Sequence, residues 1–184
     1  LMRNKWPDRI IVFFVTLITS MPSFVIATLL LYFFCIKLGV VQAFNSESNM
    51  VLLPVISLSL SPMAYITRLT KTSMLDALGQ DYIRTAKAKG VSQAKVIFVH
   101  GLRNALIPVI TYVGPMIGGI LTGSMVIESI FNIGGLGSKF VSCITNRDYT
   151  MIMATTLFLA VIMVFANLIT DIVYKLIDPR ISLD

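Results

Sequence analysis

The sequence predicts an all-α membrane protein, and three observations support this. Four uncharged stretches, near residues 10–36, 50–67, 104–127 and 149–170, lie between charged residues that are roughly 20 positions or more apart, enough for a helix to cross about 30 Å of hydrocarbon. Hydrophobic residues make up 56% of the 184 positions and charged residues 13%, against about 25% charged in soluble domains. Lysine and arginine also collect on one side of the predicted spans.

The first two stretches contain prolines and serines that shape the predicted spans. A straight helix over residues 10–36 would be about 40 Å long, so we expect it to tilt, project or kink, with the kink at Pro22. The second stretch, 50–67, is rich in serine. This polarity favours burial against other helices or beside a water-filled path, and it makes Ser57 and Ser61 candidates for a translocation path.

Glycines dominate the third stretch, over residues 104–127. Gly114 with Gly118, and Gly119 with Gly123, form two small-xxx-small pairs, which allow close helix approach. We favour helix packing here over the alternative, a smooth wall of a translocation path. The fourth stretch is a plain span.

Glu128 stands at the predicted outer end of the third stretch. A carboxylate costs much less near the interface than in mid-membrane. It is a candidate for an outer gate or for contact with the amino end of a peptide. The favoured interpretation is an interfacial charge or a packing partner for a nearby loop.

The distribution of cations predicts the orientation, because cytoplasmic loops carry the excess of Lys and Arg. One side holds only Lys37, Lys139 and Arg147. The other side, which we expect to be cytoplasmic together with both chain ends and the loop 68–103, holds the remaining twelve: Arg3, Lys5, Arg9, Arg68, Lys71, Arg84, Lys87, Lys89, Lys95, Arg103, Lys175 and Arg180. This topology accounts for the net charge of +6 without a nucleic-acid partner.

The loop 68–103 is predicted to fold as helix–glycine–helix. We expect Asp81 to cap a short helix over residues 82–89, Gly90 to end it in a left-handed conformation, and Ser92 to cap a second short helix.

The first of these helices is predicted to expose an apolar strip with a basic rim. Tyr82, Ile83 and Ala86 would be exposed beside Arg84 and Lys87. Such a helix can dock into a groove on another protein or lie on anionic headgroups. The residues alone leave both interpretations open.

A family resemblance favours docking. The sequence DYIRTAKAKG at 81–90, followed by HGLRNALIP at 100–108, resembles the EAA loop of bacterial ABC importer permeases. It is most similar to the B-type subunit of the oligopeptide/dipeptide family. Further similar segments are LP at 53–54, RLT at 68–70, SML at 73–75, ESIFN at 128–132, GGLG at 134–137, RDY at 147–149 and DPRI at 178–181.

The resemblance implies a type I ABC importer transmembrane domain in the bacterial plasma membrane. A family subunit has six spans, and this chain resembles the last four, so we expect the first two to be missing. It implies a second homologous permease subunit, two cytoplasmic ATP-binding subunits and an extracytoplasmic binding protein that delivers peptide. The implied ATPase-coupling residues are Asp81, Tyr82, Ile83, Arg84, Ala86, Lys87 and Gly90.

Other functions fit the sequence less well. No Walker lysine motif is present, so the chain is not the ATPase, and no catalytic motif such as H-E-x-x-H or G-x-S-x-G supports a membrane-embedded enzyme. We expect no cofactor. Two alternatives stay open: the same permease role for nickel or another small solute, and a truncated remnant that inserts without transporting.

Overall fold

The computed structural model describes residues 5–42, 51–121 and 124–177, and all regular structure within these ranges is helical. The prediction of an all-α fold is thereby confirmed. In chain order the elements are α1 (Trp6–Ser20), α2 (Ser23–Leu30), the π-helical η1 (Leu31–Lys37), α3 (Leu52–Gly79), α4 (Asp81–Ala88), α5 (Gln93–Lys95), the π-helical η2 (Val96–Gly101), α6 (Leu102–Leu121), α7 (Met125–Ile130), α8 (Leu136–Thr145) and α9 (Tyr149–Ile177).

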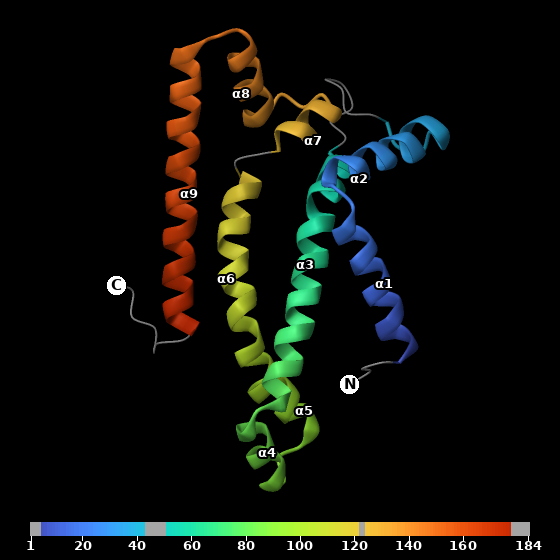
Figure 1. The fold of residues 1–184 in the computed structure, drawn as a ribbon, viewed down its shortest axis with the longest axis vertical. Coiled ribbons are helices and arrows are strands. Elements are labelled where there is room, and N and C mark those ends of the chain that lie inside the picture. Colours follow the sequence, from blue (N-terminus) through green and yellow to red (C-terminus); the bar gives the residue numbers. More distant parts are fainter. Residues whose placement is uncertain (1–4, 43–50, 122–123, 178–184) are drawn as a thin grey trace.

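Four long helices form one layer in the order α1, α3, α6, α9, each in contact with the next (Figure 1). The small helices α4 and α5 lie at one end of this layer, and α2, α7 and α8 lie at the other. Among the described residues, three stretches are long and apolar enough to cross a membrane: Leu52–Gly79, Gln93–Ile130 and Tyr149–Val173. A bent pair, Trp6–Ser20 with Ser23–Lys37, counts as a fourth if it is one span.

The bent pair breaks at the proline that the sequence singled out. Helix α1 ends at Ser20, Met21 is extended with φ −100° and ψ 131°, and the axis then turns by 103°. Proline clashes with an α-helical residue before it and pushes that residue into the extended region. Residues 10–36 therefore form two helices at a steep angle, and not the single kinked helix that we expected.

The third uncharged stretch also differs from its predicted course. Helix α6 starts at Leu102 and ends at Leu121. A separate short helix, α7, begins after Ser124, whose Oγ accepts a hydrogen bond from the Ile127 N–H at 3.4 Å. Because Ser124 caps a new helix, the end of the predicted stretch 104–127 belongs to α7, and so does Glu128.

Glycine lets α6 and α9 approach closely, as the helix-packing interpretation predicts. A Cβ added to Gly114 would lie 2.0 Å from Thr170 Oγ1, and one added to Gly118 would lie 2.7 Å from Met163 Sδ. Gly119, in contrast, faces open space, so it takes no part in this packing, and Gly123 lies outside the described residues.

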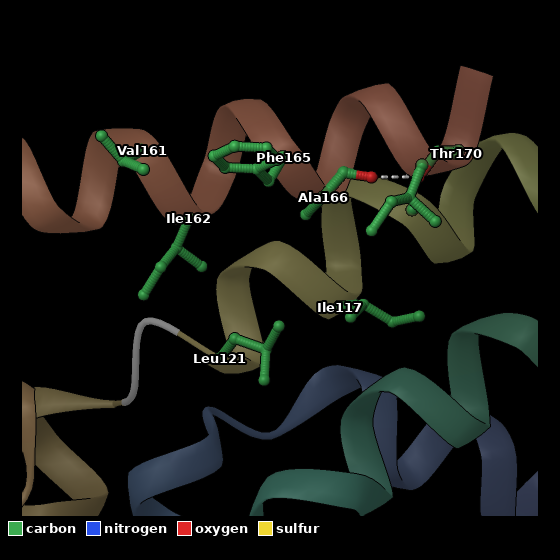
Figure 2. A pocket seen from close by; sticks show the side chains of 9 residues that line it. Ile117, Leu121, Val161, Ile162, Phe165, Ala166 and Thr170 are labelled. Atoms are coloured by element: carbon green, nitrogen blue, oxygen red, sulfur yellow. Dashed lines mark hydrogen bonds between the residues drawn. The ribbon is translucent and has the colours of Figure 1, made fainter. Parts of the chain in front are cut away.

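An apolar groove runs along the same two helices (Figure 2). Ile117 and Leu121 of α6 and Ile162 and Phe165 of α9 line a cavity of about 260 Å³. The one hydroxyl in its lining, that of Thr170, is donated to the Ala166 carbonyl at 2.7 Å. The groove therefore offers almost no hydrogen bonds to an occupant.

Candidate functional site

The helix α4 starts immediately after α3. The N-cap of α4 is Gln80, whose backbone is extended, and no side chain makes a cap hydrogen bond there. The prediction that Asp81 caps the helix is therefore wrong, because Asp81 is already its first helical residue. Its carboxylate still lies in the first turn, where it favours the positive helix end, and it forms an exposed pair with Arg84 at 3.4 Å.

Gly90 ends α4 as predicted. Its φ is +75°, in the left-handed region that glycine adopts without steric cost. The Val91 N–H donates to the Ala86 carbonyl at 3.2 Å, and the Gly90 N–H donates to the Lys87 carbonyl at 3.0 Å. These two bonds form a Schellman motif, which fixes the direction in which the chain leaves the helix.

The apolar face of α4 is buried within this chain. Ile83 is 0% exposed and Ala86 is 9% exposed, and both pack with Val96 of η2. Leu78 and Val91 complete the cluster. The prediction that Ile83 and Ala86 are exposed is wrong, because the loop folds back and η2 covers the apolar strip of α4.

Tyr82 connects α4 to the long helix α6. The residue is 41% exposed, and its hydroxyl accepts a hydrogen bond from Asn104 Nδ2 at 2.9 Å. Sequence reasoning missed this contact, which joins residues 22 positions apart. Both residues lie in the segments that carry the family resemblance, and this was the one available signal.

The C-terminal end of α3 packs against η2. A Cβ added to Gly101 of η2 would lie 3.1 Å from Leu78 Cδ2 and 3.1 Å from Met74 Cε. The loop is thus held between α3 and α6 and is no freely hanging segment. What α4 leaves exposed is a basic and polar face, formed by Arg84, Thr85 and Lys87 with Tyr82 at its edge.

Glu128 lies at the opposite end of the layer and is only 8% exposed. Its Oε2 accepts a hydrogen bond from the Ser138 N–H at 2.7 Å, in the first turn of α8. Free amides and the positive helix end both stabilise a carboxylate there. The carboxylate lies so close to Gly135 that a Cβ at that position would be 2.5 Å from Glu128 Cδ. This geometry agrees with the favoured interpretation, packing against a nearby loop.

The two candidate serines of α3 are placed differently. Ser57 is 0% exposed, and its Oγ donates to the Leu53 carbonyl at 2.7 Å. Within the described chain it therefore lines no open path. Ser61 is half-buried on the same helix. Among the described residues, no hydrogen bond joins either serine to Glu128 or to α4.

We find neither a metal-binding cluster nor a disulfide among the residues that the structure describes. No group of three or more His, Cys, Asp or Glu side chains there could hold a metal ion. Cys35 and Cys143 are both free thiols.

Comparison with known proteins places this helical membrane chain in a transporter family. Residues 1–183 match the family described as "Binding-protein-dependent transport system inner membrane component". The chain is 49% identical over 185 residues to the dipeptide transport system permease protein DppB of Bacillus subtilis, covering 100% of the chain and 60% of that protein. It is 45% identical over 181 residues to the oligopeptide transport system permease protein OppB of Haemophilus influenzae, covering 97% of the chain and 59% of that protein.

A third relative is named as a glutathione permease. The glutathione transport system permease protein GsiC of Escherichia coli is 39% identical over 180 residues, covering 97% of this chain and 59% of that protein. The chain belongs to the family of binding-protein-dependent transport system inner membrane components. It spans about 60% of the length of the curated relatives it matches.

Proposed function

We propose that this chain acts as a permease subunit of an ATP-binding-cassette importer for peptides, and that α4 is the helix held by a cytoplasmic ATP-binding subunit. Support for the transport class comes from the family match and from relatives that are named as dipeptide, oligopeptide and glutathione permeases. These three cargoes are all peptides, so peptide is favoured over nickel or another small solute. The chain itself performs no catalysis, and its ATPase partners hydrolyse the nucleotide.

The observation that carries the proposal is the two-sided construction of α4. One face is buried against η2 through Ile83 and Ala86, while Arg84 and Lys87 are exposed on the other. Full burial of a side chain such as that of Ile83 stabilises by about 1.5–3 kcal/mol. The exposed face is therefore free for a partner, while the buried face keeps the helix attached.

The contacts of α4 connect it to the long helices α6 and α3. η2 continues into α6 without a break, Tyr82 bonds to Asn104 of α6, and Gly101 lies against the end of α3. A displacement of α4 would therefore shift the ends of both helices. Moving a two-state element from 1:99 to 99:1 takes about 5.5 kcal/mol, and a closing pair of ATP-binding subunits would supply this free energy through α4.

Orientation and partners complete the proposal. Helix α4 and the start of α1 lie at the same end of the layer, which is the end with the excess of Lys and Arg. We place this end in the cytoplasm of a bacterial cell. The assembly comprises a second homologous permease, two ATP-binding subunits and an outer binding protein in the plasma membrane.

Co-purification with the ATP-binding subunits tests the docking role. Arg84→Glu combined with Lys87→Glu reverses two charges on the exposed face without touching Ile83. Lys95→Glu, an exposed position on α5, is the matched control. We expect normal insertion for both, and loss of the ATP-binding subunits from the double variant alone. Retention of these subunits and of peptide uptake in the double variant would refute the docking role.

A further inference from the structure

A second groove, between α1 and α3, combines an aliphatic wall with cations. It encloses about 240 Å³. Ile11, Val12 and Val15 of α1 and Leu75 of α3 form its apolar surface. The groove lies beside the ends of two predicted spans, and no function considered above uses it.

Two basic side chains of α3, Arg68 and Lys71, also line this groove. Arg68 is exposed and is the first charged residue after the uncharged part of α3. Lys71 Nζ bonds to Asp8 Oδ1 of α1 at 2.5 Å. Asp8 thus balances one of the two cations, and the groove keeps an excess of one positive charge.

Three threonines, Thr16, Thr67 and Thr72, also line the groove, and the hydroxyls of two of them are already donated within α3. The hydroxyls of Thr67 and Thr72 are donated to the backbone carbonyls of Met63 and Arg68, at 2.7 Å and 3.0 Å. An occupant with a negative charge would therefore be recognised by the guanidinium and the ammonium. An occupant with a hydrocarbon portion would be recognised by the aliphatic wall.

We propose that this groove binds an anionic glycerophospholipid, with the phosphate beside Arg68 and Lys71 and one acyl chain along Val12 and Val15. The cations lie where the uncharged stretch ends, at the level where hydrocarbon gives way to headgroups. Basic pockets between membrane helices bind anionic headgroups in this way. The inference rests on the proposed function only for the side of the membrane on which the groove lies.

Photocrosslinking of the assembled transporter tests the site. The transporter is placed in phosphatidylcholine vesicles that contain phosphatidylglycerol with a photoreactive acyl chain, and the labelled peptides are mapped by mass spectrometry. The variant is Arg68→Gln. Arg9→Gln is the matched control, because Arg9 lies near the same end of α1 but lines a different pocket, with Trp6 and Phe13.

We expect phosphatidylglycerol to label the groove segments of α1 and α3. Labelling should fall about fivefold in Arg68→Gln, the change that ~1 kcal/mol per basic residue produces, and stay within twofold in Arg9→Gln. Equal labelling by a phosphatidylcholine probe, an unchanged Arg68→Gln, or a groove unlabelled because a partner helix fills it would each overturn the proposal.

Co-purification of the ATP-binding subunits is measured on the same samples. If Arg68→Gln keeps these subunits while groove labelling by the two lipids is equal, the lipid site is refuted and the docking role of α4 stands. If the wild-type chain carries no ATP-binding subunit while phosphatidylglycerol still labels the groove selectively, the proposed function fails and the lipid site stands.

Discussion

Asn104 donates a hydrogen bond from Nδ2 to the hydroxyl of Tyr82, with 2.9 Å between the two atoms. The bond joins the short helix α4 to the first turn of the long helix α6. An apolar contact accompanies it, because Ile83 and Ala86 of α4 pack against Val96 of η2, the element that continues into α6. A displacement of α4, the movement that we propose for the docked helix, would therefore reach α6 directly through this hydrogen bond and indirectly through η2.

Removing the tyrosine hydroxyl should loosen α4 without unfolding it. A hydrogen bond contributes about 0.5–1.5 kcal/mol net, and an exposed one belongs at the lower end. We expect Tyr82→Phe to increase amide hydrogen exchange of α4 about two- to threefold. Asn104→Ala should have a similar effect, and the double variant should exceed neither single variant. Strictly additive effects would show that the two side chains are not coupled.

Gly90→Ala should destabilise the end of α4. A left-handed conformation costs a residue with a Cβ about 1–2 kcal/mol, and Gly90 has φ +75°. Trypsin should then cleave after Lys89 several-fold faster. The control is Gly79→Ala, at the last position of α3, where an added Cβ meets nothing within 4 Å. Equal cleavage of the two variants would contradict the Schellman geometry.

Alanine substitutions in α6 should follow the contacts with α9. Gly114→Ala would place a methyl group 2.4 Å from Thr170 Cβ, an atom that no side-chain rotation moves. It should lower the free energy of unfolding by about 1–3 kcal/mol or more. Gly118→Ala should destabilise the protein less because Met163 is flexible, and Gly119→Ala should destabilise it least. Thermal unfolding in detergent would measure the order, and three equal melting temperatures would contradict this packing.

Two glycines that follow α7, Gly134 and Gly137, offer a comparison of the same kind. A Cβ at Gly137 would lie 2.8 Å from the Met125 backbone nitrogen, whereas one at Gly134 meets nothing within 4 Å. Gly137→Ala should therefore lower the melting temperature and Gly134→Ala should leave it nearly unchanged. Similar melting temperatures for the two would argue against the close approach of α7 and α8.

Glu128→Gln separates the two interpretations of this carboxylate. If it holds the start of α8, the loss of its charge should cost about 0.3–2 kcal/mol and reduce uptake only through stability. Loss of peptide uptake at an unchanged melting temperature would instead identify Glu128 as part of the path for the cargo.

The sequence predicted features that depend on local physics. The position of the break at Pro22, although not its sharpness, and the end of α4 at Gly90 follow from the local backbone effects of these two residues. The close approach at Gly114 and Gly118 follows from their spacing on one helix face.

The cap of α4 was misplaced by one residue, from Gln80 to Asp81, and the other errors arose mostly where the answer depends on distant residues. The apolar strip of α4 could face a partner or its own chain, and nothing within residues 81–90 shows that Val96 covers Ile83. The Tyr82–Asn104 bond depends on how the loop folds back. An uncharged run also does not distinguish one long helix from α6 followed by α7, and Ser124 was the signal for that break.

The docking of α4 can be tested most directly with a single cysteine at its exposed face. Lys87→Cys is made together with Cys35→Ala and Cys143→Ala, which remove the two free thiols. In intact cells we expect no labelling of Cys at this position by a membrane-impermeant thiol reagent, and in membranes a crosslink to an ATP-binding subunit. Labelling from outside the cell, or repeated failure to crosslink to that subunit, would contradict the account.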